Sequence, residues 1–168
     1  MFNTILGIPA HPLLIHFAVV FIPLLVVGAI VYAAWPPFHP RIGWAVLALA
    51  IIAPFCGLFA KLSGQDFKAR LIREKLTSSK GLSQIAVHNS YGNHTFWWTV
   101  ALGILTLVLI GYYWQTGKST TTVATDGAAS WNAVRIGSTV VMVVVGAIVG
   151  YYVFRTGDTG AHIVWQGY

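Results

Sequence analysis

The residues of this chain best suited to bind a metal ion or a cofactor are its six histidines. Imidazole nitrogen is a common ligand of zinc, copper and haem iron. In an apolar environment an imidazole is costly unless it forms a hydrogen bond or binds a metal. Five of the six lie beside or within the ends of apolar segments, on what is argued below to be one side of a membrane or in its leaflet: His11, His16, His88, His94 and His162. This grouping predicts a ligand site.

Helical spacing limits how these histidines can combine. His11 and His16 are five positions apart and His88 and His94 six apart, which corresponds to directions about 140° and about 120° apart on a helix. One helix therefore cannot easily present two ligands to one metal. The pattern suits a haem held by one imidazole from the first helix and one from the third. Tetrahedral zinc fits less well, because Cys56 is the only cysteine and no carboxylate is close in sequence.

We take His16 and His88 as the first choice of axial ligands, with His94 as the alternate to His88. His11 and His162 are expected to form a second shell or a second site. Lys61 and Arg155 close the second and fourth apolar segments on the same side, where they could pair with haem propionates; we include them among the candidate cofactor-binding residues.

Four apolar segments must position these side chains. Only 8% of the 168 residues are charged and the mean hydropathy is +0.72, whereas soluble domains carry about 25% charged residues. A helix needs about 20 apolar residues to cross a bilayer, and the segments at about 12–35, 42–60, 95–114 and 134–154 qualify. The sequence therefore predicts an all-α integral membrane four-helix bundle that forms a single domain over 1–168.

The connection at about 61–94 is the longest between two spans. Phe67, Leu71 and Leu76 can share one face there, with basic residues on the other. That pattern predicts an amphipathic helix that lies in the membrane interface, within a longer connecting loop.

The distribution of basic residues predicts the orientation. Seven of the ten Lys and Arg residues lie on the side of the N-terminus, most of them within 61–94. By the positive-inside rule both termini of this multi-pass membrane protein should be cytoplasmic. Membrane orientation explains the net charge of +6 better than binding to nucleic acid does.

The apolar segments contain no Asp, Glu, Lys or Arg near their centres. Proton-coupled transporters usually keep such a residue in the membrane as a relay or substrate partner. His16 is the only ionisable residue of this kind here, which weighs against a transporter driven by carboxylates.

Three stretches of the sequence resemble a widespread bacterial family of four-helix membrane proteins without a defined function. They are Gly7–Phe17, which contains His11-Pro12-Leu13-Leu14-Ile15-His16; Val87-His88 with Gly92-Asn93; and Arg155–Ala161 followed by Val164-Trp165. Some relatives carry a fused Rieske iron–sulfur domain, so the resemblance implies a redox setting. The spacing around Gly92-Asn93 leaves open whether His88 or His94 is the matching position.

These observations predict a membrane protein that binds b-type haem near the cytoplasmic leaflet. Its expected task is electron transfer with a quinone or a redox partner protein, as a component associated with an oxidoreductase. One alternative is an accessory subunit of a larger respiratory complex without catalysis of its own. Another is a transporter for a small solute or ion, for which so few helices would require a homo-oligomer.

Overall fold

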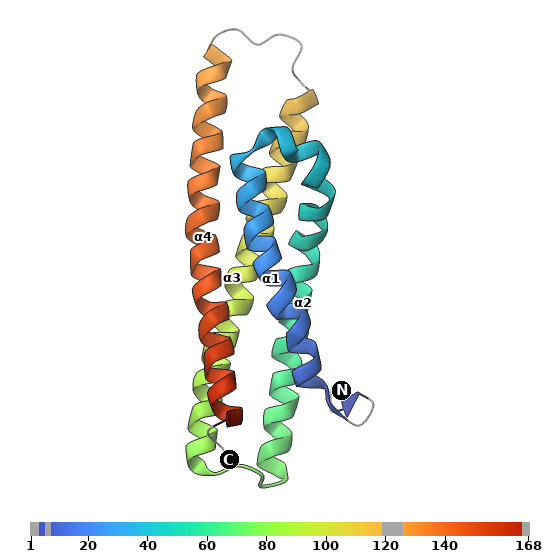
Figure 1. Ribbon diagram of the computed structural model, residues 1–168, viewed down its shortest axis with the longest axis vertical. Helices are drawn as coiled ribbons and strands as arrows, with labels where there is room; N and C mark the ends of the chain where they lie inside the picture. The colour runs from blue at the N-terminus through green and yellow to red at the C-terminus, as the bar shows by residue number, and fades with distance from the viewer. Residues whose placement is uncertain (1–3, 6–7, 119–125, 166–168) are drawn as a thin grey trace.

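The computed structural model describes residues 4–5, 8–118 and 126–165 of the chain. Four long helices run alternately up and down and make up nearly all of it (Figure 1). They are α1 (Ala10–Ala34), α2 (His39–Arg73), α3 (Ser79–Lys118) and α4 (Asp126–Trp165). The predicted all-helical four-helix architecture is therefore confirmed.

Short elements complete the described part of the chain. Two two-residue strands, β1 (Thr4–Ile5) and β2 (Ile8–Pro9), pair antiparallel ahead of α1. A single 3-10 turn, η1 (Pro36–Phe38), joins α1 to α2. This tight connection makes α1 and α2 antiparallel neighbours, as the short spacing between the first two apolar segments requires.

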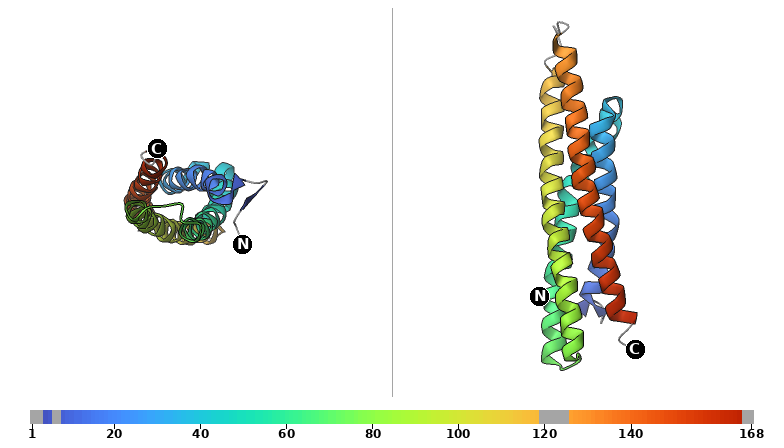
Figure 2. Two further views of the ribbon diagram at one scale, coloured as in Figure 1. Left: turned by 90° about the horizontal axis from the view of Figure 1, so that it is seen from below. Right: turned by 90° about the vertical axis from the view of Figure 1, so that its left-hand side faces the viewer.

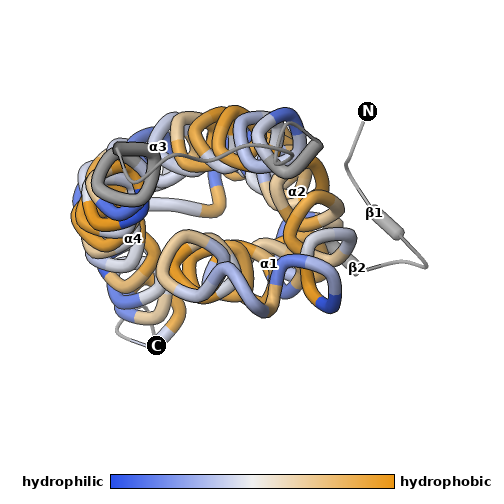
Figure 3. Tube along the Cα trace, turned by 90° about the horizontal axis from the view of Figure 1, so that it is seen from above, coloured by the Kyte–Doolittle hydropathy of each residue, from blue (hydrophilic) through white to orange (hydrophobic). Residues whose placement is uncertain are grey.

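The helices follow one another around the bundle axis (Figure 3). Each helix packs against its neighbours in sequence, and α4 closes the ring against α1. Helices α1 and α3 are therefore diagonal, with few direct contacts. The helices are staggered along the bundle axis. In the side views, the hairpin of α2 and α3 extends beyond the start of α1 (Figures 1 and 2). We call the end where α1 begins and α4 ends the site end.

The structure differs from the expected interfacial loop at 61–94. Helix α2 continues without interruption to Arg73, α3 begins at Ser79, and only residues 74–78 connect them. Lys75 adopts a positive φ of 53° at this turn. The segment is rich in Lys, Arg, Ala, Leu and Gln, which are good helix formers. The helix can therefore continue past the end of the second apolar segment.

Helix α4 also continues further than hydropathy indicates. The fourth apolar segment was expected to end near residue 154, with the conformation of the following tail left open. In the structure α4 runs on to Trp165. At the other end, the expected connection 115–133 is largely taken up by the ends of α3 and α4, and its residues 119–125 lie outside the described part.

Apolar side chains cover the outside of the bundle as well as its core. Leu25, Ala29, Ala53, Leu102 and Val149 are fully buried inside. Yet only 17–33% of the most apolar stretch of each long helix is buried. Large apolar side chains on the outer faces are exposed, among them Phe17, Val27, Phe55, Phe59, Ile104, Val108, Val144 and Phe154. Such a surface is stable in lipid, so these faces contact the bilayer.

Gly103 sets the distance between α2 and α3. A Cβ atom at this position would lie 2.8 Å from the carbonyl oxygen of Ala50 and 3.1 Å from Cγ of Pro54. The backbone of α2 at Ala50 cannot move away from a new methyl group as a flexible side chain could. Gly103→Ala should therefore destabilise the protein by about 1–3 kcal/mol. Gly111→Ala, on the same helix with nothing within 4 Å of a new Cβ, should instead leave the stability equal or raise it by about 0.5–1 kcal/mol. Unfolding free energies in detergent micelles test both, and equal effects would contradict this packing.

Candidate functional site

His11 lies in the first turn of α1 and faces α2. Its Nδ1 atom lies 3.0 Å from Oγ of Ser63, a residue that is completely buried. The ring lies directly over Gly64, where a Cβ atom would come within 3.0 Å of Cε1 of His11. Phe67, one turn further along α2, stacks on the imidazole with ring centres 6.2 Å apart. Thus α2 holds this ring with one hydroxyl group and one glycine.

His88 occupies the corresponding place between α3 and α4. Its Nδ1 atom lies 3.2 Å from Oγ1 of Thr159. A Cβ atom at Gly160 would come within 3.1 Å of Cε1 of His88. Again a hydroxyl group and the glycine that follows it hold the ring.

The two imidazoles meet across the bundle axis. Their ring centres are 6.4 Å apart and their planes are inclined by 79°. Both rings are partly buried, and they come from the diagonal helices α1 and α3. The site end of the bundle therefore carries a pair of facing imidazoles to which all four helices contribute.

The site has a sequence signal that hydropathy does not reveal. Each hairpin supplies a histidine from its first helix and a hydroxyl–glycine dipeptide from its second. The dipeptides are Ser63-Gly64 and Thr159-Gly160. Neither pair was among the expected site residues, because a hydroxyl next to a glycine is common in many sequences. Only their shared placement opposite a histidine distinguishes them.

The other candidate histidines on this side lie outside the pair. His16, His94 and His162 are all exposed, and the Nδ1 atom of each bonds to a carbonyl oxygen four residues earlier in its own helix. His94 also stacks on Tyr152, with ring centres 5.0 Å apart. The structure thus places His11, rather than His16, opposite His88, and it brings neither His94 nor His162 to the pair.

His39 lies at the opposite end of the bundle. Its Nε2–H donates to the carbonyl oxygen of Tyr32 at 2.7 Å, and the two rings stack with centres 3.9 Å apart. This histidine caps the bundle there and does not belong to the pair.

Lys61 and Arg155 lie close to the pair along their helices, but each has other partners. Nζ of Lys61 donates to Oδ1 of Asn93 at 2.7 Å and lies 5.0 Å from the ring centre of Phe96. Arg155 donates to the Tyr91 hydroxyl at 3.3 Å and to Asp158 at 3.4 Å. Lys61 is two residues before Ser63 and Arg155 four before Thr159, so both cations are within about one helical turn of the hydroxyl groups.

The residues around the pair offer only two metal ligands. Among the described residues, no group of three or more His, Cys, Asp or Glu side chains could hold a metal ion. A metal bound by His11 and His88 would therefore need its remaining ligands from a cofactor or from solvent.

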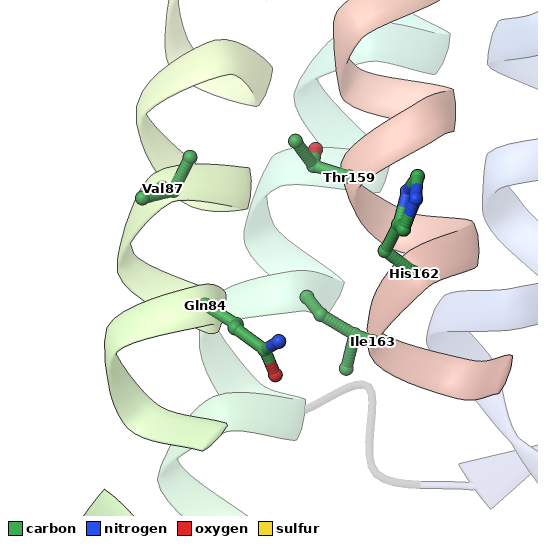
Figure 4. Close-up of a pocket in the computed structure, with 5 residues that line it drawn as sticks. All are labelled: Gln84, Val87, Thr159, His162 and Ile163. Carbon is green, nitrogen blue, oxygen red and sulfur yellow. The ribbon is translucent and has the colours of Figure 1, made fainter. Parts of the chain in front are cut away.

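A small pocket lies beside the pair, between α3 and α4. It has a volume of about 150 Å³ and is lined by Gln84, Val87, Thr159, His162 and Ile163 (Figure 4). Thr159 and His162 lie on neighbouring turns of α4, and Gln84 and Val87 come from the adjacent α3. Pockets for large ligands measure about 300–1,000 Å³, so this pocket does not accommodate a large cofactor. His162 therefore contributes to a minor surface pocket.

Comparison with known proteins identifies the family. Residues 7–167, almost the whole chain, match the family model described as "Predicted membrane protein (DUF2231)". No curated protein and no solved structure matches the chain. The matched residues include all four helices and both histidines of the pair. The match agrees with the resemblance of the sequence to a family of membrane proteins. The chain therefore belongs to the DUF2231 family of predicted membrane proteins.

Proposed function

We propose that this protein binds b-type haem between α1 and α3, with His11 and His88 as the axial ligands, and transfers electrons at the site end of the bundle. The observation that carries the proposal is the facing pair of imidazoles, 6.4 Å apart between ring centres. This assignment keeps the expected His88 and replaces the expected His16, which is exposed on the outer face of α1.

The separation of the rings would suit two imidazoles that hold one metal ion. An imidazole nitrogen binds first-row metal ions at about 2 Å, and its ring centre lies about 1 Å behind the nitrogen, so two imidazoles that share one ion between them have centres about 6 Å apart. The ring centres of His11 and His88 are 6.4 Å apart. The Nδ1 atoms of His11 and His88 lie within hydrogen-bond distance of the hydroxyl groups of Ser63 and Thr159, so we assign Nε2 of each ring as the nitrogen that would bind the metal.

The surroundings also fit a haem. Gly64 and Gly160 let both rings lie close to neighbouring helices. Lys61 and Arg155 supply positive charge nearby, suited to propionate groups. When bound, haem would supply a one-electron redox centre. The residues of the chain would hold it in place, limit water access and adjust its potential through burial and hydrogen bonds.

We place the site at the cytoplasmic border of the bacterial inner membrane. The basic residues Lys68, Arg70, Arg73, Lys75 and Lys80 lie on the α2–α3 hairpin, which extends from the same end of the bundle. With 35 residues, α2 is about 50 Å long, whereas the hydrocarbon core measures about 30 Å. A quinone in the lipid or a redox partner protein in the cytoplasm would then exchange electrons with the haem.

A reporter fused after Tyr168 tests this orientation. We expect green fluorescent protein at this position to fluoresce and alkaline phosphatase to be inactive, because both termini face the cytoplasm. An active phosphatase together with a dark fluorescent fusion would reverse the orientation and place the histidine pair at the outer border.

The visible spectrum tests the haem proposal directly. The protein, purified in mild detergent from cells supplied with iron and haem precursor, should show a Soret band and, after reduction with dithionite, a sharp α band. Haem extracted into acidified solvent should be noncovalent and close to stoichiometric. A colourless protein that also fails to bind added haemin would overturn the proposal.

A further inference from the structure

We propose that Ser63 and Thr159 are positioning residues that hold His11 and His88 in the tautomer with the proton on Nδ1, so that both Nε2 lone pairs face the ligand. The effect of these hydroxyl groups on haem rests on the function proposed above. Their effect on the tautomers is a property of the protein itself and can be tested without haem.

The direction of each hydrogen bond follows from the proton of the hydroxyl group. Ser63 Oγ donates to the carbonyl oxygen of Ala60 at 3.0 Å. A hydroxyl group has one proton and two lone pairs, so when that proton donates to Ala60 the oxygen is left to accept from His11. This arrangement assigns the proton of His11 to Nδ1 and the lone pair of the neutral ring to Nε2.

The same argument applies to the second hairpin. Thr159 Oγ1 donates to the carbonyl oxygen of Arg155 at 2.7 Å, and its remaining lone pairs face Nδ1 of His88. The proton of His88 is therefore on Nδ1 as well. The two hairpins therefore use the same arrangement. In each, the hydroxyl group donates its proton to a carbonyl oxygen of its own helix, and the hydroxyl oxygen accepts from the imidazole of the neighbouring helix.

The glycine after each hydroxyl residue is part of this device. A Cβ atom at Gly64 or Gly160 would lie 3.0 or 3.1 Å from Cε1 of the ring, which is closer than ordinary contact. The glycines let each imidazole lie flat enough against the helix for Nδ1 to reach the hydroxyl. The dipeptides Ser63-Gly64 and Thr159-Gly160 therefore position the two imidazoles in the same way.

A fixed tautomer has a chemical consequence for the metal ligand. An acceptor on Nδ1–H orients the ring and raises the basicity of the nitrogen that binds the metal. Loss of such a partner costs about 10- to 100-fold in metal affinity. The reduction potential of the haem should also rise, because a less basic imidazole stabilises the ferric state less.

The test uses Ser63→Ala and Thr159→Val, each of which removes one hydroxyl with little change in volume. Nitrogen NMR of ¹⁵N-histidine in the haem-free protein reports the tautomer, with signals assigned by His11→Gln and His88→Gln. In the unsubstituted protein both rings should carry the proton on Nδ1. Ser63→Ala should shift only the His11 signals towards a tautomer mixture, and Thr159→Val only those of His88, so that each variant is a control for the other.

Three further measurements separate positioning from simple packing. Thr106→Val removes a hydroxyl as buried as that of Ser63, which donates to the carbonyl oxygen of Leu102 in its own helix, and should change neither ring. Thr159→Ser, which keeps the hydroxyl, should restore the His88 tautomer. Haemin affinity should fall about 10- to 100-fold in Ser63→Ala and Thr159→Val but not in Thr106→Val.

The possible outcomes distinguish this inference from the haem proposal. Rings protonated on Nε2 in the unsubstituted protein, or tautomers that do not respond to either substitution, would overturn the positioning roles. An equal response to Thr106→Val would do the same. Responsive tautomers in a protein that binds no haem would support the positioning roles and reject haem as the ligand.

Discussion

Replacement of His11 or His88 by alanine is expected to remove most of the bound haem, by at least about 10-fold, while His16→Ala and His94→Ala retain it. The ligands themselves should matter no less than their hydrogen-bond partners, whose loss costs about 10- to 100-fold in affinity. His16 and His94 are exposed and bond within their own helices. The haem content of the purified variants, measured by extraction and normalised to protein, provides the test.

Folding must be controlled in this experiment, because both rings are partly buried. His11→Gln and His88→Gln keep a polar side chain that can still approach the hydroxyl groups, and they should yield a folded protein without the spectrum of the unsubstituted form. Unchanged haem in both alanine variants would mean that the facing pair is not the binding site. Loss in His16→Ala, with His11→Ala unaffected, would restore the assignment that the sequence favoured.

Hydropathy predicted the number of helices but not their length. Lipid imposes an apolar surface on a spanning helix, so the four spans can be read from composition alone. Beyond Ala60 the constraint changes, because a helix that leaves the bilayer needs only good helix formers and a neighbour to pack against. Helix α2 continues to Arg73 beside the first turns of α3. A prediction from hydropathy therefore places the end of such a helix at the end of its apolar segment, which is too early.

The choice between His11 and His16 could not be made from the sequence for a related reason. A soluble helix reveals its buried face through an apolar stripe. Helix α1 is apolar on all sides, because lipid surrounds the faces that do not pack on other helices. Helical angles showed that only one of the two histidines could face a given ligand. They could not show which one, and the answer depends on where α2 presents Ser63 and Gly64.

The equivalence of the two hairpins explains why the site needs all four helices. Each hairpin positions one imidazole with its own second helix, so neither ring depends on the other hairpin for its orientation. The ligand pair forms only when α1 and α3 face each other across the bundle. The geometry of the pair therefore depends on how the two hairpins pack and on the close approach between helices at the glycines.

Gly160→Val is therefore expected to displace the imidazole of His88, although the substitution removes none of the polar groups of the site. A Cβ atom at this position lies 3.1 Å from Cε1 and 3.4 Å from Nδ1 of His88, and the two methyl groups of valine extend further. The ring must move away, and its bond to Thr159 is lost. We expect haem binding to fall at least about 10-fold and the protein to lose about 1–3 kcal/mol from overpacking.

Gly157→Val is the matched control, one turn earlier on α4. It introduces the same β-branched side chain into the same helix, but nothing lies within 4 Å of the new Cβ atom. Haem content and the NMR signals of His88 should stay as they are in the unsubstituted protein. If Gly157→Val removed the haem as completely as Gly160→Val, the loss would come from the helix as a whole. A difference between the two variants, together with shifted His88 signals only in Gly160→Val, would trace the effect to the contact between one glycine and one imidazole.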